Sequence, residues 1–233
     1  RDMKLKITLI GCGKMGSALL NGWLDNGYSK KNLQVIEKDV NICRLLNKEG
    51  IESYSNFEEA PNSSEKEIII FAVKPQVLEE VLNNIKNYKF EQTFFLSIVA
   101  GVKINFYKEI LGFQHSYFRA MPNIPVEVKQ GMTALFKNEN CREEESKIIE
   151  NLLVSVGDVI WVENEEAIDV VTAISGSGPA YFFYLTECLI KAAISQGLSL
   201  DLSKRLSMQT FFGSSELLKS SKQGPETLRK NVT

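Results

Sequence analysis

The sequence predicts an α/β fold in which a doubly wound, mostly parallel sheet is followed by an all-α domain. Up to about residue 163, short apolar runs alternate with helical patterns. Beyond that point the chain is helical and strongly apolar, with one glycine-rich interruption. We therefore expect one domain over residues 3–163 and a second over residues 164–233.

The first predicted strand and the turn after it organise the first domain. Leu5–Ile10 is an apolar, β-branched run, and residues 11–16 read Gly-Cys-Gly-Lys-Met-Gly before a helix that ends near residue 27. Gly11 permits a tight turn, Gly13 lets the backbone approach a pyrophosphate, and Gly16 lets the helix pack close to the strand. The helix N-terminus offers unpaired N–H groups to phosphates. The turn predicts a dinucleotide site of the Rossmann type, with a merely structural turn as the alternative.

The remaining elements of the first domain follow from the hydrophobic pattern. Further strands are expected at residues 33–37, 50–54, 67–73, 93–99, 115–121, 132–136 and 158–162. Helices are expected at residues 42–48, 76–85 and 146–155. This alternation is typical of βαβ units, so most of the strands should be parallel.

The second domain is predicted to be helical throughout. Residues 165–196 carry only one break, Gly-Ser-Gly-Pro at 176–179, and residues 180–194 are apolar almost all round. A second helix is expected at residues 203–219, and residues 225–233 open a further helix or loop. So much apolar surface on a small helical domain predicts burial against another subunit.

Composition and charge narrow the function classes. The chain has 233 residues, of which 44% are hydrophobic and 24% charged, as in an ordinary soluble globular protein. Its net charge of −2 argues against a nucleic-acid surface, and no basic stripe is visible. No apolar run reaches the length needed to cross a bilayer. We therefore expect neither a nucleic acid nor a membrane among the partners.

The cysteines and the chain start indicate the compartment. Four cysteines are scattered without Cys-x-x-Cys spacing, at Cys12, Cys43, Cys141 and Cys188. Neither a zinc site nor a disulfide framework is suggested, so no metal is expected. The charged opening residues run straight into the first strand without a signal peptide, and Met3 is expected to be the native start. A cytoplasmic protein is the default expectation.

Two neighbouring residues bear on the choice between NAD and NADP. Glu37 ends the second predicted strand, where an acidic side chain can accept hydrogen bonds from the adenosine ribose. A solvated strand-end carboxylate is the alternative. Lys38 beside it could instead hold a 2′-phosphate. Glu37 points to NAD and Lys38 to NADP, with a slight preference for NAD.

Other candidate residues lie at predicted strand ends. Residues 72–75 (Ala-Val-Lys-Pro) and 99–101 (Val-Ala-Gly) fall at the carboxyl edge of the sheet, where doubly wound folds bind ligands. Ordinary turn chemistry would explain them equally well. Asn123 lies between two prolines and could orient a carboxamide or a bound water, or simply shape a rigid turn. His115 is the single histidine and is expected in a strand without a catalytic role.

Five motifs together resemble those of pyrroline-5-carboxylate reductases. They are IGCGKMG at residues 10–16, FAVKPQ at 71–76, SIVAGV at 97–102, RAMPNIP at 119–125 and ISGSGPAY at 174–181. The resemblance covers nearly the whole chain. It implies an oxidoreductase that reduces L-1-pyrroline-5-carboxylate to L-proline with NAD(P)H, the last step of proline biosynthesis. It also implies helical domains that interlock in a dimer or a ring of dimers.

The resemblance extends the set of expected site residues. Those expected to bind the cofactor are Ile10, Gly11, Cys12, Gly13, Lys14, Met15, Gly16, Glu37, Lys38, Asn56, Ala72, Val73, Lys74, Pro75, Ile98, Val99, Ala100 and Asn123. Those expected near the substrate are Ser177, Gly178, Glu165 and Thr233. Because an iminium carbon is already electrophilic, such an enzyme needs mainly to orient two reactants and exclude water. This agrees with the lack of an obvious acid–base dyad.

The end of the sequence limits what the resemblance implies. Residues 228–233 resemble the opening of the family's C-terminal signature, which continues into a Ser-Pro-Gly-Gly-Thr segment. In the family that segment binds the substrate carboxylate and supplies the hydroxyl nearest the reacting ring. The second domain is therefore expected to be C-terminally incomplete, and the sequence as given should bind cofactor better than it catalyses.

Two other functions are alternatives to this one. A β-hydroxyacid dehydrogenase also joins a Rossmann domain to a helical one, but its catalytic lysine would fall at position 182, which is Phe182 here. A non-catalytic NAD(P)-sensing module would bind the cofactor without oxidising it when pyrroline-5-carboxylate is present.

Overall fold

The computed structural model describes residues 5–61 and 66–233, so the predicted start at Met3 lies outside the described residues. The chain divides into two compact units, one ending at Ser177 and the other running from Gly178 to Thr233. The predicted boundary after residue 163 remains a prediction, and the short α6 (Ala167–Val171) belongs to the first unit.

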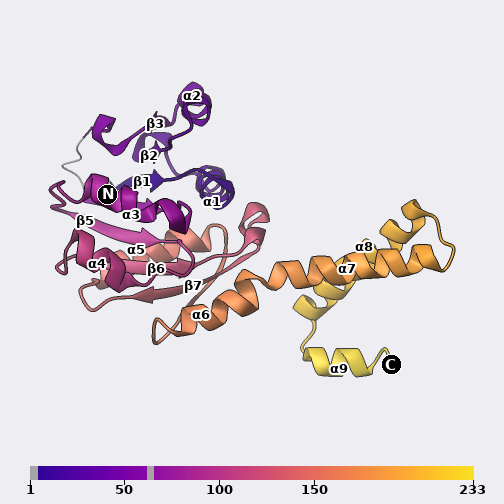
Figure 1. Ribbon diagram of the computed structural model, residues 1–233. Helices are drawn as coiled ribbons and strands as arrows, with labels where there is room; N and C mark the ends of the chain where they lie inside the picture. Colours follow the sequence, from indigo (N-terminus) through magenta and orange to yellow (C-terminus); the bar gives the residue numbers. More distant parts are fainter. Residues whose placement is uncertain (1–4, 62–65) are drawn as a thin grey trace. The chain divides into compact units, whose positions relative to one another are not determined.

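The first unit is built on one sheet, which has eight strands in the described residues, in the order β3-β2-β1-β4-β5-β6-β7-β8 (Figure 1). The strands are β1 (Leu5–Ile10), β2 (Leu33–Ile36), β3 (Glu52–Tyr54), β4 (Lys66–Phe71), β5 (Thr93–Ser97), β6 (Tyr117–Met121), β7 (Gly131–Lys137) and β8 (Gly157–Trp161). Every neighbouring pair is parallel except β6 and β7. The predicted doubly wound, mostly parallel sheet is confirmed. Strand order reverses beside β1, so β1 and β4 flank a topological switch point.

Helices connect the strands and cover both faces of the sheet. They are α1 (Lys14–Asp25), α2 (Val40–Lys48), α3 (Pro75–Ile85), α4 (Ile104–Leu111) and α5 (Glu143–Val154). Shorter turns of 3-10 helix lie at Lys30–Asn32, Phe57–Glu59 and Ile124–Val128, and a π-helical turn at Thr172–Gly176 leads out of α6. The sequence pattern did not predict α4. It also carried β4 and β5 two residues too far and placed His115 in a strand, whereas β6 begins at Tyr117.

The core consists of two layers, one on each face of the sheet. Because strand side chains alternate between faces, Leu9 of β1 packs with α1 and α5 while the next residue, Ile10, packs with α3 and α4. In the first layer the indole N–H of Trp23 donates to the carbonyl oxygen of Leu152 at 3.0 Å, which ties α1 to α5. In the second layer Phe71 stacks on Phe95 across adjacent strands. Both layers exclude water almost completely, so the first unit holds a finished core.

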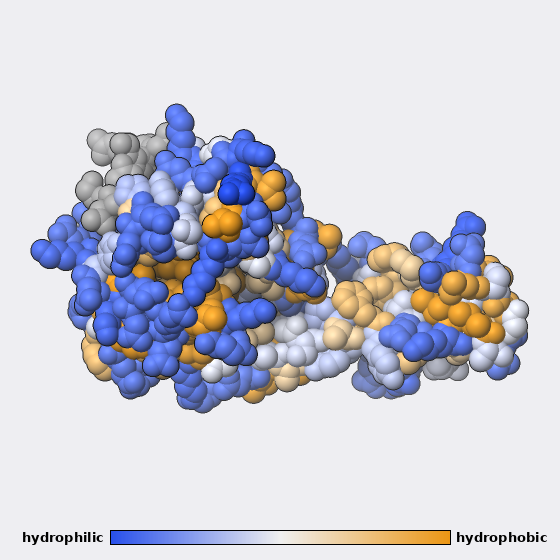
Figure 2. Space-filling view, turned by 45° about the horizontal axis from the view of Figure 1, so that its top comes forward, coloured by the Kyte–Doolittle hydropathy of each residue, from blue (hydrophilic) through white to orange (hydrophobic). Residues whose placement is uncertain are grey.

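The second unit contains three helices in which few residues are covered. They are α7 (Gly178–Ser195), α8 (Leu200–Ser220) and α9 (Pro225–Lys230). The first two pack against each other, with the rings of Phe182 and Phe211 5.8 Å apart. The buried residues of α7 and α8 are only Gly178, Ser203 and Ser207. Figure 2 shows the apolar side chains that remain on the surface of these helices.

Candidate functional site

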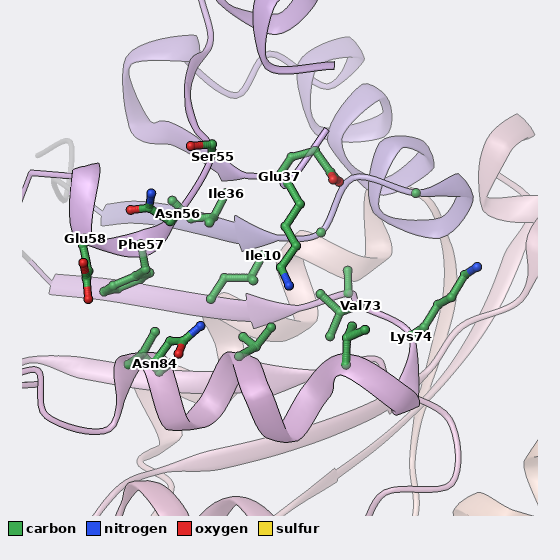
Figure 3. A pocket seen from close by; sticks show the side chains of 17 residues that line it. Ile10, Ile36, Glu37, Ser55, Asn56, Phe57, Glu58, Val73, Lys74 and Asn84 are labelled. Carbon is green, nitrogen blue, oxygen red and sulfur yellow. The ribbon is translucent and has the colours of Figure 1, made fainter. Parts of the chain in front are cut away.

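A cavity of about 490 Å³ lies at the carboxyl edge of the sheet, next to the switch point. Nine of the predicted cofactor residues line it, namely Ile10, Gly11, Gly13, Glu37, Lys38, Asn56, Ala72, Val73 and Lys74. They come from four segments that are distant in sequence and end side by side because parallel strands share one carboxyl edge. In Figure 3, Glu37 and Ser55 approach the cavity from the β2 and β3 side and Asn84 approaches it from α3.

The three glycines of the first turn are required for different reasons. Gly11 has a φ of +94°, and a Cβ there would lie 2.7 Å from the carbonyl oxygen of Ala72. A Cβ at Gly16 would lie 2.4 Å from the carbonyl oxygen of Gly11. Gly13, the N-cap of α1, has no atom within 4 Å of its Cβ position, and no side chain caps the helix. Glycine is therefore required at positions 11 and 16 by the fold itself, because a side chain there would clash with the backbone. At Gly13 the space beside the helix N-terminus is open.

The Glu37 carboxylate is held in place by the backbone. One oxygen accepts the N–H of Cys12 at 2.7 Å and the other accepts the N–H of Asp39 at 3.0 Å. Glu37 thus joins the end of β2 to the glycine turn. Burial, with a smaller contribution from the Glu37 charge, raises the pKa of the Cys12 thiol to about 11. This thiol therefore stays protonated at neutral pH, as expected for an unreactive turn residue.

Lys38 also lines the cavity, and its ammonium is paired. Its Nζ lies 2.7 Å from Oε1 of Glu80, which belongs to α3. The pair joins two of the segments that border the cavity, the turn after β2 and α3.

Apolar side chains also line the cavity, among them Phe57, Val77 and Val81. The amide of Asn84 belongs to the same lining (Figure 3). Asn56, which the sequence placed among the cofactor residues, caps the 3-10 turn: its Oδ1 accepts the N–H of Glu59 at 3.1 Å. An apolar slot with amides at its edge suits a flat heteroaromatic ring such as adenine.

The predicted residues after β5 lie outside this cavity, in a turn fixed by hydrogen bonds. The Ser97 hydroxyl accepts the N–H of Val99 at 3.1 Å and lies 2.5 Å from the hydroxyl of Tyr107, a residue of α4. Burial raises the pKa of Tyr107 well above its ordinary value, so this phenol remains neutral. This pair of hydrogen bonds, the Ser97–Tyr107 clamp, fixes the backbone at Val99, and the N–H of Ile98 donates to the carbonyl oxygen of Phe71 at 3.0 Å. Pro75 begins α3.

A smaller cavity, of about 230 Å³, contains three more of the predicted residues, Lys14, Met15 and Asn123. The Asn123 amide is used within the fold. Its Oδ1 accepts the N–H of Met132 at 2.8 Å, and its Nδ2 donates to the carbonyl oxygen of Ser175 at 2.9 Å. A contact with a ligand would have to use its second N–H or the second lone pair of Oδ1, so its role in binding remains a prediction.

A buried ion pair accounts for Glu165. The Arg119 side chain is only 2% exposed, and it donates to Glu165 at 3.1 Å and to Asp169 at 3.4 Å. The same Glu165 oxygen accepts the N–H of Ile104, the first residue of α4, at 2.7 Å. Glu165 therefore caps α4 and neutralises a buried arginine. Arg119 belongs to the motif at residues 119–125, and its burial, which the motif does not reveal, is what distinguishes it.

The other residues predicted near the substrate lie at the ends of segments. Ser177 follows the π-helical turn, and its N–H donates to the carbonyl oxygen of Thr172 at 2.8 Å. Gly178 begins α7 in the second unit. The Thr233 hydroxyl donates to the carbonyl oxygen of Arg229 at 3.3 Å. Their catalytic roles remain predictions.

The part of the chain that the structure describes holds neither a membrane-spanning helix nor a metal-binding cluster. No helix there has the length and hydropathy that crossing a bilayer requires. No group of three or more His, Cys, Asp or Glu side chains there is arranged for a metal ion.

Two family models match the chain. Residues 165–233 match the model described as pyrroline-5-carboxylate reductase dimerisation. Residues 6–101 match the model described as NADP oxidoreductase coenzyme F420-dependent. The first model covers the helical part and the second covers the glycine turn and the main cavity.

Similar proteins are found in bacteria and eukaryotes. The pyrroline-5-carboxylate reductase of Aquifex aeolicus is 34% identical over 99% of this chain and 84% of its own length. A structure of a pyrroline-5-carboxylate reductase from Coxiella burnetii is 31% identical, covers 98% of this chain and 84% of that one, and superposes with a TM-score of 0.87. The Plasmodium falciparum pyrroline carboxylate reductase, solved with NADP bound, is 33% identical, covers 99% of this chain and 85% of that one, and has a TM-score of 0.84.

More distant structures share the fold alone. A prephenate dehydrogenase from Aquifex aeolicus is 13% identical, with a TM-score of 0.61.

Proposed function

This chain belongs to the pyrroline-5-carboxylate reductase family, and we propose how its own residues serve the reaction of that family. It is an NAD(P)H-dependent oxidoreductase that reduces L-1-pyrroline-5-carboxylate to L-proline, the last step of proline biosynthesis. Neither the β-hydroxyacid dehydrogenase alternative nor the sensing alternative is favoured, because relatives and solved structures of 30% or more identity are named pyrroline-5-carboxylate reductases. The observation that carries the proposal is the open space at Gly13, beside a helix N-terminus and at the rim of a cavity.

The cofactor fits the cavity as follows. The pyrophosphate lies over residues 11–16, where the N-terminus of α1 offers N–H groups and Gly13 leaves room for close approach. The adenosine ribose lies at Glu37 and Lys38, with adenine in the slot beside Phe57. The nicotinamide end runs past residues 72–75 toward the clamped turn at residues 98–100.

The chemistry asks little of the protein beyond orientation. When bound, the reduced nicotinamide supplies a hydride to C5 of the imine, and the imine nitrogen ends up protonated in the product. The Ser97–Tyr107 clamp fixes the backbone against which the nicotinamide would rest. Arg119 and Glu165 fix the start of the helix that carries Tyr107. Ser177, Gly178 and Thr233 are proposed to face the substrate. Pre-organised walls of this kind lower the barrier through proximity and exclusion of water.

We also propose that the protein forms a homo-oligomer in the cytoplasm and does not bind nucleic acid. The dimerisation segment supports a homodimer, and the family resemblance favours a dimer or a ring of dimers. The acidic balance of charge supports the proposal that nucleic acid is not a partner. Four free thiols fit a reducing, cytoplasmic setting.

A steady-state assay tests the proposal. Full-length protein is expected to oxidise NADH or NADPH only when L-1-pyrroline-5-carboxylate is present, with L-proline formed in equal amount. Tight cofactor binding without such turnover would favour the sensing module instead. The same assay without pyrroline-5-carboxylate is the control for slow background oxidation.

A further inference from the structure

The Lys38–Glu80 ion pair lies near the proposed position of the adenosine ribose, the part of the cofactor in which NADH and NADPH differ. Glu37 and Lys38 follow β2, at the end of the cavity where an adenosine ribose would lie. NADPH carries a 2′-phosphate on that ribose and NADH carries a hydroxyl. Within the cavity lining, Lys38 is the cation next to the strand end that reads this ribose position.

The surroundings of Lys38 disfavour an added phosphate. The Glu37 carboxylate is fixed by two backbone N–H groups, so it cannot swing away from a second anion. The Lys38 ammonium is already neutralised by Glu80 at 2.7 Å. A 2′-phosphate that paired with Lys38 would have to share the ammonium with the Glu80 carboxylate or displace it, whereas a 2′-hydroxyl needs no counter-ion.

We propose that Glu80 is a specificity-determining residue, which holds Lys38 against α3 and so lowers the affinity for the phosphorylated dinucleotide relative to the unphosphorylated one. The inference rests on the proposed cofactor placement. Both side chains of the pair are more than half exposed, at 65% for Lys38 and 60% for Glu80. Exposed ion pairs contribute little, so a phosphate dianion competes with Glu80 and the effect is a bias of about two- to fivefold.

Glu80→Gln is the variant that isolates this effect. It keeps the shape of the side chain and releases Lys38. Its matched control is Glu79→Gln, which removes the same charge from the adjacent position of α3, where the Glu79 side chain pairs with no cation among the described residues. Both positions are exposed, so neither substitution should affect folding.

The test is a fluorescence titration of each protein with NADPH and with NADH. Glu80→Gln is expected to tighten NADPH binding about two- to fivefold and leave NADH binding unchanged, while Glu79→Gln changes neither selectively. Adding Lys38→Gln to Glu80→Gln should remove the gain. Higher salt should shrink it, because exposed charges are screened.

Three outcomes would overturn the inference: an unchanged NADPH to NADH affinity ratio in Glu80→Gln, an equal change in Glu79→Gln, or a gain that survives Lys38→Gln. Failure of the proposed function is a separate result, since it would be seen as absent turnover of pyrroline-5-carboxylate by the unmodified full-length enzyme. If Glu80→Gln changed the NADPH to NADH affinity ratio but the unmodified enzyme did not turn over pyrroline-5-carboxylate, the role of Glu80 would be supported and only the proposed reaction would be rejected.

Discussion

The two units of this chain differ in how completely their apolar side chains are buried. In the first unit, large residues such as Trp23, Phe71 and Phe95 are almost fully buried between the sheet and its helices. In the second, Phe183 and Leu189 of α7 and Phe212 of α8 are exposed at 59%, 45% and 54%. Both units have helices of ordinary length, so the difference lies in what covers them.

This contrast shows what each unit needs in order to be stable. A sheet with helices on both faces can bury period-2 and period-3.6 apolar patterns within one chain. A helix that is apolar on all sides cannot be covered by a single neighbour such as α8. The first unit is therefore complete by itself, while the second presents the kind of surface that marks a subunit interface.

The largest expected effect comes from charging the exposed apolar surface of α7. The double substitution Phe183→Glu and Leu189→Glu should weaken subunit association by a factor on the order of 10³, because carboxylates would be buried at the interface. Activity of the full-length enzyme should be lost with it, and circular dichroism should show the secondary structure of the first unit unchanged.

The matched control places the same charges on the first unit. Leu45 and Phe113 are each 60% exposed there. Leu45→Glu with Phe113→Glu should leave assembly intact. Equal loss of assembly in both double variants would show that the two surfaces do not differ.

The glycines of the first turn provide the next test. Gly13→Val should weaken NADH binding roughly 100-fold, or about 2.8 kcal/mol, with the fold kept, because the new side chain fills only the approach to the turn. Gly16→Val should instead destabilise the first unit by about 3 kcal/mol or more, since its Cβ would clash with the Gly11 carbonyl.

Titration with NADH and thermal unfolding distinguish the two variants. Unchanged NADH affinity in Gly13→Val would contradict the proposal that this turn binds the pyrophosphate.

A smaller effect is expected at the ribose position. We predict a modest preference for NADH over NADPH, and Glu37→Ser should shift the ratio of kcat/KM values toward NADPH by about tenfold, through loss of carboxylate–phosphate repulsion. The assay is steady-state kinetics with both cofactors. A ratio that stays constant would mean that Glu37 serves only to hold the Cys12 and Asp39 N–H groups.

The smallest effect concerns a buried acid in the first unit. Burial raises the pKa of Glu67 above its ordinary value, although the Thr8 hydroxyl donates to it at 2.5 Å. A carboxyl whose pKa is raised on folding contributes stability at low pH that is lost as the pH rises through the folded-state pKa.

Glu67→Gln should therefore raise the melting temperature at pH 7 by about 2–4 °C and flatten its decline above pH 4.5. The exposed Glu91→Gln is the control. Should Glu67→Gln melt at a lower temperature than the unmodified protein at pH 7, the ionised carboxylate is stabilising after all.

The features that could be predicted from the sequence are local ones. The glycine turn, most strand positions and the apolar character of α7 depend on residues within one or two turns of each other. Family resemblance then supplied the reaction. The ends of β4 and β5 were predicted two residues too far. After β4 the chain is already turning into α3, because Lys74 forms the N-cap of that helix.

What the sequence could not reveal depends on distant partners. The N-terminus of α4 is capped by Glu165, 61 residues away along the chain, so no neighbouring residue marked the start of that helix. The helical spacing of Ile104, Tyr107 and Leu111 was the local signal that could have found it. Lys38 and Glu80 are 42 residues apart, and only the fold places them together. Arg119 looks like a surface residue in a motif until its burial is known.

Sedimentation of the unmodified protein tests the central contrast most directly. If the second unit is completed by another copy of the chain, the protein at micromolar concentration should sediment as a dimer or a multiple of it. A single monomeric species at that concentration would contradict the account, because the exposed apolar surface of α7 and α8 would then be stable without a partner.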